Sequence, residues 1–261
     1  MRQSYGVDCS NWQGELTPKV AACLRESNCE YLIAGTQTGN DGNTYTRQQI
    51  EAAASVGIIT EAYVWLRWGS SPILAVQAAL AKIQGLPVDR LWLDCEEAPG
   101  AFSPAQIVAF IKSAVSACGN FPCGIYTGAW WWVPNTGNSQ ELSYLPLWHA
   151  GYTHAGWMQG PRFDTFHPYG GWTQPHTWQY DSNHGLCTWG VDLNVREVVE
   201  DMPEADQMEL TLLRAKRQLD KALINGPLIT VPGPTPNTVE LHRIIDGQGH
   251  PFNPPLIIPL D

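Results

Sequence analysis

The stretch LWLDCEE, residues 91–97, places three carboxylates at the end of an apolar run. Side chains alternate between faces in a strand, so Asp94 and Glu96 would share one face about 6 to 7 Å apart. Like charge and partial burial both raise the pKa of one of the two acids. A protonated acid beside an ionised one is the equipment for cleaving glycosidic bonds. The alternative for this D-x-E pattern alone is a pair of acids that keeps a strand end soluble.

Two further acids fall at the ends of strand-like segments. Asp8 ends the segment YGVDC, and Asp192 lies within GVDLNV. If the strands close into a barrel, the first and the last are neighbours, and both acids can face the same mouth as Asp94 and Glu96. Taken singly, each of these aspartates could also be an ordinary surface residue. Together, the four carboxylates predict a catalytic group. Like charges brought this close repel one another, and solubility alone would not require that cost in stability.

The elements that must position these acids alternate between strand and helix. Short apolar runs predict strands at 5–9, 30–36, 58–66, 89–96, 123–128, 145–151, 176–180 and 190–195. This pattern is typical of a parallel α/β sheet, and eight strands in about 195 residues favour a barrel. The last third has few helix signals. We therefore expect an irregular α/β barrel whose later strands lack helices.

Start and stop signals delimit the expected helices. Thr17-Pro18 and Ser71-Pro72 each combine an N-cap residue with proline at the first helical position. Capping boxes, in which an N-cap hydroxyl is followed three residues later by Glu or Gln, are expected at Thr46–Gln49 and at Ser103–Gln106. These signals predict helices that end near residues 26, 57, 84 and 118.

Composition restricts the partners. The net charge of −10 disfavours nucleic acid and anionic membranes, which attract basic patches. No apolar run nears the roughly 20 residues of a membrane span. No phosphate-binding glycine loop and no Cys/His set with zinc spacing occurs, so no cofactor or metal is predicted. The N-terminus has no apolar signal region, so we expect synthesis in a cytoplasm and, for any extracellular work, another exit route.

Seven cysteines and seven histidines are scattered along the chain. Cys23/Cys29 and Cys118/Cys123 are close enough in sequence to pair, but reduced, mostly buried thiols are the favoured interpretation for a protein made in the cytosol. His149 and His154 could be read as ligands, although packing or surface roles are favoured.

The composition changes after residue 200. Asp201–Glu204 caps an expected helix at about 203–225, whose apolar residues follow a short a/d seam. The seam fits either a packed amphipathic helix or a short coiled coil. Residues 227–261 are rich in Pro and Gly and are expected to be extended, and disordered unless a partner holds them. We therefore expect two parts, a barrel over 1–200 and a docking or oligomerisation tail over 201–261.

The ordered motifs YGVDCSNWQG, LWLDCEE, GIYTG, LPLWHAGY and WQYDSN…GVDLNV resemble glycoside hydrolase family 25. These lysozymes cut the N-acetylmuramyl–N-acetylglucosamine bond of peptidoglycan, and many come from bacteria and phages. The resemblance covers about residues 4–196. It implies a flattened, irregular TIM-like (β/α)5(β)3 barrel of five β/α units and three bare strands, and the few helix signals in the last third agree with the bare strands.

The resemblance also implies roles. Glu96 matches the general acid of the family, and Asp94 matches the acid proposed to orient the N-acetyl group of the substrate. Asp8 and Asp192 match the other carboxylates of the groove. The family is thought to retain configuration with the acetamido group of the substrate as nucleophile.

Other residues are assigned to substrate binding through the same motifs. Tyr63, Trp65, Tyr126 and Trp148 would form aromatic walls of a groove, with packing inside the barrel as the alternative, and Gln179 of WQYDSN would contact substrate.

Two strands depart from the family pattern. The second strand of the family often ends in Thr-Glu-Gly, where this chain has Gln37, and the third often reads Ala-Tyr-His-Phe, where it has Val64 and Trp65. These changes could alter which substrate is bound, and they are also compatible with a loss of catalytic activity.

Three functions therefore stay open. The first is a muramidase of phage lysis or virion wall penetration, acting on peptidoglycan glycan strands and joined through 201–261 to itself or to virion tail proteins. The second is a catalytically weak or inactive glycan-binding or structural virion component on the same scaffold. The third is a hydrolase for another N-acetylated glycan such as chitin.

Overall fold

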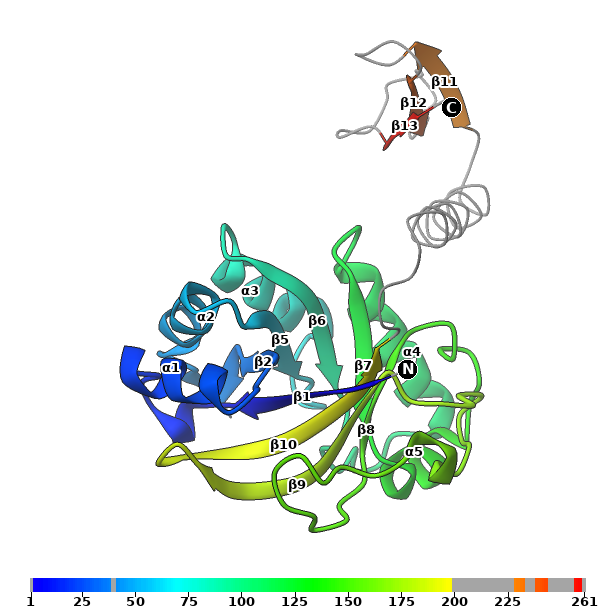
Figure 1. The fold of residues 1–261 in the computed structure, drawn as a ribbon. Helices are drawn as coiled ribbons and strands as arrows, with labels where there is room; N and C mark the ends of the chain where they lie inside the picture. The colour runs from blue at the N-terminus through cyan, green and yellow to red at the C-terminus, as the bar shows by residue number, and fades with distance from the viewer. Residues whose placement is uncertain (1, 39–40, 199–227, 233–237, 244–255, 260–261) are drawn as a thin grey trace. The chain divides into compact units, whose positions relative to one another are not determined.

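The computed structural model describes residues 2–38, 41–198, 228–232, 238–243 and 256–259. The chain divides into two compact units, residues 1–198 and 199–261, and each is described by itself. In the first unit eight strands close into a barrel in the order β1-β10-β9-β8-β7-β6-β5-β2, with helices packed outside them (Figure 1). This arrangement confirms the expected α/β barrel.

The barrel strands are β1 (Arg2–Cys9), β2 (Tyr31–Gly35), β5 (Ile59–Trp65), β6 (Val88–Asp94), β7 (Cys123–Thr127), β8 (Leu147–Ala150), β9 (Thr177–Leu186) and β10 (Trp189–Val198). The helices are α1 (Pro18–Glu26), α2 (Thr46–Ser55), α3 (Pro72–Ile83), α4 (Pro104–Ala117) and α5 (Ala129–Thr136). Smaller elements are the two-stranded β3 (Gln37–Thr38) and β4 (Asp41–Gly42), and the single-turn helices η1 (Asn11–Gln13) and η2 (Phe163–Thr165).

Five strand–helix units are followed by three strands without α-helices between them. All neighbouring strands from β1 through β2 and on to β9 pair in parallel, whereas β10 pairs antiparallel with both β9 and β1. The antiparallel direction of β10 brings its first half, not its end, to the mouth, which is the rim at the C-terminal ends of the parallel strands.

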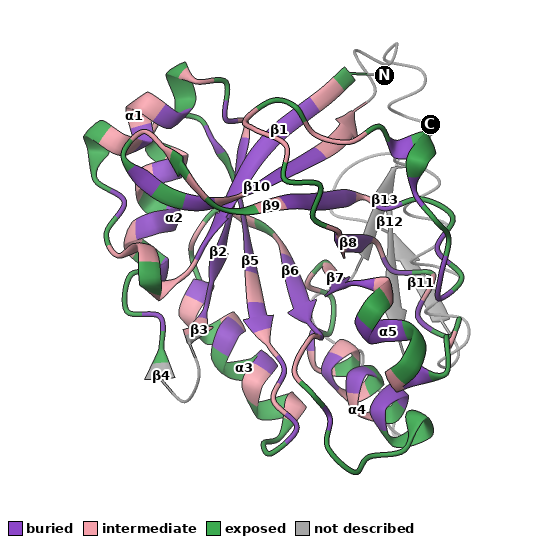
Figure 2. Ribbon diagram, turned by 90° about the horizontal axis from the view of Figure 1, so that it is seen from below, coloured by how far each residue is buried: buried purple, intermediate pink, exposed green. Residues whose placement is uncertain are grey.

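Glycines make room for aromatic side chains inside the barrel. In three register pairs an aromatic ring lies against a glycine of the adjacent strand, Tyr31 against Gly6, Tyr63 against Gly35 and Trp92 against Gly124. A Cβ at any of these glycines would come within 2.8 Å of the ring. Alternating large and small residues therefore fill the interior, and Figure 2 shows the buried residues concentrated along the strands and on one side of each helix.

The start signals of three helices are confirmed. Thr17 and Ser71 accept hydrogen bonds from the first turns of α1 and α3, and Ser103 with Gln106 forms the capping box of α4. The capping box predicted at Thr46 is wrong. Thr46 is the first helical residue of α2, and its hydroxyl donates to the carbonyl oxygens of Gly35 and Asn43, because this side chain is buried against the end of β2.

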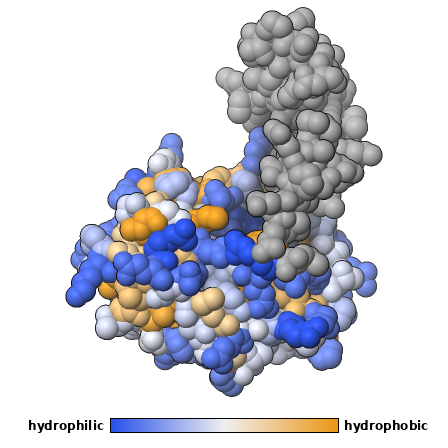
Figure 3. All heavy atoms as spheres, viewed as in Figure 1, coloured by the Kyte–Doolittle hydropathy of each residue, from blue (hydrophilic) through white to orange (hydrophobic). Residues whose placement is uncertain are grey.

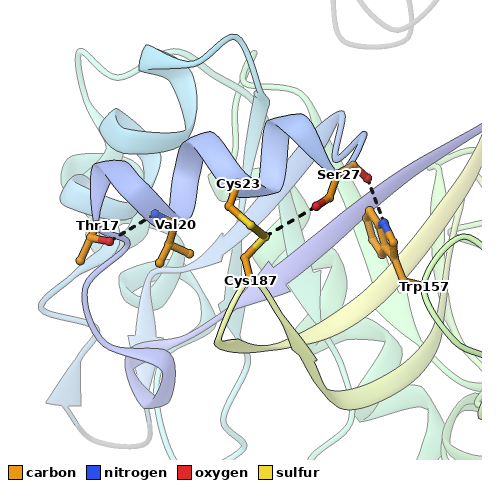
Figure 4. Close-up of a disulfide and its surroundings, with 6 residues drawn as sticks. All are labelled: Thr17, Val20, Cys23, Ser27, Trp157 and Cys187. Atoms are coloured by element: carbon orange, nitrogen blue, oxygen red, sulfur yellow. Dashed lines mark hydrogen bonds between the residues drawn. A yellow bond between two sulfur atoms is a disulfide. The ribbon is translucent and has the colours of Figure 1, made fainter.

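One disulfide corrects the expectation of reduced thiols. Cys23 of α1 is bonded to Cys187, which lies in the turn between β9 and β10, with a sequence separation of 164 (Figure 4). Neither of the pairs that are close in sequence forms a disulfide, and the other five cysteines are thiols. The bond fixes the β9–β10 hairpin to α1, and Trp157 donates to the carbonyl of Ser27 beside it.

Apolar and hydrophilic residues are interspersed on the face seen in Figure 3. Within the part of the chain that the structure describes, no helix has the length and apolar character needed to cross a membrane.

The second unit contains a three-stranded antiparallel sheet of β11 (Leu228–Pro232), β12 (Thr238–Arg243) and β13 (Leu256–Pro259). The expected extended backbone is present there, but these strands pair with one another within the chain. The predicted helix at 203–225 lies outside the described residues.

Candidate active site

Asp8 and Asp192 face each other across the closure of the barrel. Asp8 is the second-last residue of β1, Asp192 lies in the first half of β10, and the two are register partners in the antiparallel pair. The neighbouring strands thus meet as the sequence analysis expected, although Asp192 does not lie at a strand end. Asp8 is buried, and Asp192 is partly exposed at the mouth.

Asp94 and Glu96 approach the mouth from β6. Asp94 is the last residue of the strand and is 5% exposed, and its register partners are Trp65 on β5 and Tyr126 on β7. Glu96 lies beyond the end of the strand, so the alternation argument applies to Asp94 alone. Their charges nevertheless interact, because Glu96 raises the pKa of Asp94 after the larger effect of burial.

Gln179 of β9 connects the aspartates to two tyrosines. Its amide nitrogen donates to Oδ2 of Asp8 at 2.9 Å and to Oδ2 of Asp192 at 3.3 Å. Its amide oxygen accepts from the hydroxyls of Tyr126 at 2.7 Å and Tyr152 at 3.1 Å. Because Gln179 is only 3% exposed, the structure places it as a bridge that orients the acids rather than as an open groove surface.

Two further amides complete the hydrogen bonds to these aspartates. Asn194 donates to Oδ2 of Asp8 at 2.6 Å, and its own oxygen accepts from the indole of Trp148 at 2.8 Å. The main-chain N–H of Asn183 donates to Oδ1 of Asp192 at 2.8 Å. The aspartates are therefore held in fixed orientations by neutral donors.

All four carboxyl groups have raised pKa values. Burial is the largest cause for each of them. The charge of Asp192 adds to the pKa of Asp8, while hydrogen bonds from Asn194 and Gln179 lower it. For Glu96 the Tyr126 hydroxyl lowers the pKa and Asp192 raises it, with a net rise. A carboxyl whose pKa is raised keeps its proton closer to neutral pH, as a general acid must.

The four aromatic residues assigned to a groove divide into two pairs. Trp148 and Tyr126 are buried in an interior cluster with Tyr31, Ile33, Trp92 and Ala150, which favours the packing alternative for both. Tyr63 and Trp65 are partly exposed. Any aromatic wall among the four is therefore formed by Tyr63 and Trp65 of β5.

Sequence reasoning missed several residues of this site. Asn194 carried a signal, because it lies two residues from Asp192 and so on the same face of a strand. Tyr152 and Asn183 carried none, since both contacts depend on where β9 lies. Trp12 in η1 and Trp130 in α5 are 86% and 61% exposed, and both follow the mouth ends of strands.

Other candidate features do not belong to the site. Glu97 accepts from the main-chain N–H of Trp68 at 3.0 Å and pairs with Arg67, so its role is structural. His149 packs against Phe166 and Trp178, and burial lowers its pKa to about 4. The departure at Val64 is fully buried on the side of β5 opposite to Tyr63 and Trp65, away from the mouth.

No group of His, Cys, Asp and Glu side chains suited to a metal ion occurs among residues that the structure describes. A surface pocket of about 450 Å³ lies at the end of α3, lined by residues such as Leu80, Leu86 and Phe121. It contains no acid, so its apolar walls offer no chemistry of their own.

An α/β barrel with acids gathered at one mouth is an architecture of glycoside hydrolases, and comparison with known proteins agrees. Residues 2–180 match the family model described as Lysozyme-like protein 1. The chain belongs to this family, among the glycoside hydrolase family 25 lysozymes.

A curated relative has a similar sequence, and two solved structures have a similar fold. The "Probable GH family 25 lysozyme 3" of Dictyostelium discoideum is 26% identical over 198 residues, which cover 72% of this chain and 40% of that protein. The chain therefore spans less than half of the length of this relative. The crystal structure of a lysozyme from Streptomyces coelicolor has a TM-score of 0.62 at 20% identity, over 75% of this chain and 93% of that one. The spore cortex lytic enzyme SleM of Clostridium perfringens gives 0.61 at 17% identity, over 92% and 76%.

Proposed function

We propose that the barrel is a muramidase, which cleaves the β-1,4 bond between N-acetylmuramic acid and N-acetylglucosamine in peptidoglycan. The observation that carries the proposal is the position of Glu96, a carboxyl with a raised pKa that shares the mouth with three other buried or partly buried acids. The choice of peptidoglycan as the substrate rests on membership of the family, because the geometry alone would also suit another N-acetylated polymer.

The reaction assigns one proton transfer to Glu96. Its protonated carboxyl donates to the glycosidic oxygen as the bond to the leaving sugar breaks. The carbonyl oxygen of the acetamido group of the substrate forms a bond to the anomeric carbon, and a water later replaces it while Glu96 takes up the proton of that water. The configuration is therefore retained.

The aspartates support this step through charge. Ionised carboxylates at the mouth stabilise the positive charge that develops on the sugar in the transition state. Asp8 and Asp192 are held by Gln179, Asn194 and Asn183, so they need little reorganisation when the charge appears.

Mass spectrometry of the products from purified peptidoglycan tests the proposal. The parent should release fragments with muramic acid at the new reducing end, and Glu96→Gln should not. Glu97→Gln is the matched control, because Glu97 is the adjacent acid with structural partners. If a folded parent releases no fragments from peptidoglycan but binds its glycan strands as tightly as Glu96→Gln does, the inactive glycan-binding component is the correct function.

We further propose that this activity serves phage lysis or wall penetration by a virion, with residues 201–261 as the docking or oligomerisation segment. The proposal rests on the Pro- and Gly-rich composition of that segment. A variant that lacks 201–261 should keep its activity on peptidoglycan and lose self-association or particle association in sedimentation. Loss of folding in that variant would instead assign the segment to the barrel core.

A further inference from the structure

Two polar atoms at the mouth of the barrel are buried without hydrogen-bond partners in the structure. They are the indole nitrogen Nε1 of Trp65 and the carboxyl oxygen Oδ1 of Asp94. One is a donor and the other an acceptor. Buried groups of this kind are normally satisfied, because an unmade hydrogen bond leaves the cost of desolvation uncompensated.

The two side chains lie next to each other and face the interior. Trp65 and Asp94 are register partners on the adjacent parallel strands β5 and β6, so they share one face of the sheet. Tyr63 and Trp92, two residues earlier on the same strands, pack together in the interior cluster. Trp65 and Asp94 therefore continue the interior face outward to the mouth, beside Glu96.

Trp65 differs from the other tryptophans of the chain. Nine of the twelve indoles donate a hydrogen bond to a protein oxygen, and these are Trp68, Trp92, Trp131, Trp132, Trp148, Trp157, Trp172, Trp178 and Trp189. Trp12 and Trp130 are exposed to solvent. Trp65 is left as the one indole whose nitrogen is buried and unpartnered in the described part of the chain.

We propose that Trp65 is a specificity-determining residue for the acetamido group of the sugar. An acetamido group presents a carbonyl oxygen, which accepts from the Trp65 N–H, and an amide N–H, which donates to Oδ1 of Asp94. The inference rests on the proposed function for the choice of an N-acetylated glycan. It goes further in naming a donor that the phenylalanine of the family pattern lacks.

Binding to an inactivated protein tests the proposal without turnover. In the Glu96→Gln background, affinity is measured by calorimetry for peptide-free peptidoglycan glycan strands and for the same strands after chemical de-N-acetylation. Adding Trp65→Phe should weaken binding of the N-acetylated strands about 2- to 10-fold, the value of one neutral hydrogen bond. Binding of the de-N-acetylated strands should stay unchanged.

Stability supplies a second readout with a matched control. Trp65→Phe removes no hydrogen bond within the protein but loses ring area and the contact with Arg67, whose guanidinium lies 5.4 Å from the ring centroid of Trp65. Its melting temperature should therefore fall by less than that of a tryptophan variant that also loses a hydrogen bond. Trp68→Phe removes the bond from the indole of Trp68 to the carbonyl of Glu97 at 2.9 Å. It should melt lower and leave the discrimination between the two glycans intact.

Three results would overturn the inference. Equal weakening for both glycans would show that Trp65 acts as an apolar wall or donates to a sugar hydroxyl. No weakening would show that its N–H does not contact the glycan. A fall in melting temperature for Trp65→Phe as large as that for Trp68→Phe would show that the N–H of Trp65 has a partner inside the protein. The proposed function can fail separately from this inference. The binding test needs no turnover, so a parent that does not cleave peptidoglycan can still be tested for preferring the N-acetylated strands.

Discussion

Buried carboxylates lie at both ends of the barrel, but only those at one end are paired with cationic side chains. At the end opposite the mouth, Glu61 near the start of β5 is 3% exposed. The guanidinium of Arg196 donates to both of its oxygens at 3.1 Å, the Trp92 indole donates at 2.6 Å, and Arg90 lies 3.9 Å away. Arg196 also lies over the ring of Tyr31 at 3.5 Å. This carboxylate is neutralised and satisfied.

At the mouth, none of the four acids forms an ion pair with Lys or Arg in the part of the chain that the structure describes. Asp8 and Asp192 have only neutral donors, and Oδ1 of Asp94 has no partner. Uncompensated like charge is costly for folding, whereas a paired charge of the Glu61 kind holds two strands together. The contrast is the one expected if the end with Glu61 serves stability and the mouth serves the proposed chemistry.

The largest expected effect is on activity at the mouth. Glu96→Gln should lower kcat on peptidoglycan by about 10²- to 10⁴-fold, because the amide cannot donate the proton. Its free energy of unfolding at neutral pH should not fall, because the lost carboxyl is held there with a raised pKa. Kinetics and urea unfolding measure the two quantities. A large loss of stability with unchanged kcat would reverse the roles of the two ends.

The matching substitution at the other end should give the opposite pattern. Glu61→Gln leaves Arg196 and Arg90 without their counter-charge inside the barrel, and we expect a loss of about 3 to 5 kcal/mol in the free energy of unfolding. The kcat of the remaining folded protein should be unchanged. Urea unfolding and active-site-normalised kinetics check this, and a loss below about 1 kcal/mol would show that water screens the pair.

Local sequence signals predicted most of the barrel and all four acids. Periodic apolar runs, N-cap residues and prolines act within a few residues, so the eight barrel strands and four of the five helices followed from them. The fifth β/α unit followed only from the resemblance to the family. The acids at 8, 94, 96 and 192 could be grouped once closure placed the first and last strands side by side. The pairing of charges such as Glu61 and Arg196 could not be predicted from the sequence, because the two residues are 135 positions apart.

Other misses have similar physical reasons. The hairpin of β9 and β10 was predicted too short, because its turn has positive φ at Cys187 and Thr188 instead of a glycine or asparagine signal. The link from Cys187 to Cys23 spans 164 residues and has no local pattern. Helix α5 follows Gly128, which offers no side-chain cap, and it contains Pro134, so no local signal predicted it.

A smaller effect concerns the stability cost of the mouth. The pKa of Asp94 is raised in the folded state, so the folded protein binds this proton more tightly than the unfolded chain does. The stability of the fold therefore falls as pH rises from about 3.9, the unfolded value, through the folded pKa. Asp94→Asn should therefore match the parent near pH 3 and exceed it at pH 7, by on the order of 1 kcal/mol. Urea unfolding at both pH values measures the difference. A gain that is equal at both pH values would point to packing rather than to charge.

The smallest expected effect is a displacement of the pH profile. Activity requires protonated Glu96, so kcat/KM falls as pH rises through its pKa, which burial raises most and Asp192 raises further. Asp192→Asn removes that repulsion and should move the alkaline limb to lower pH, in addition to any loss of maximal rate. Asp164→Asn is the control, because Asp164 is an exposed acid of η2 that pairs with Arg162. It should not shift the alkaline limb of the pH profile. A limb that stays fixed in Asp192→Asn would mean that Asp192 acts on the substrate alone, and that burial by itself sets the acidity of Glu96.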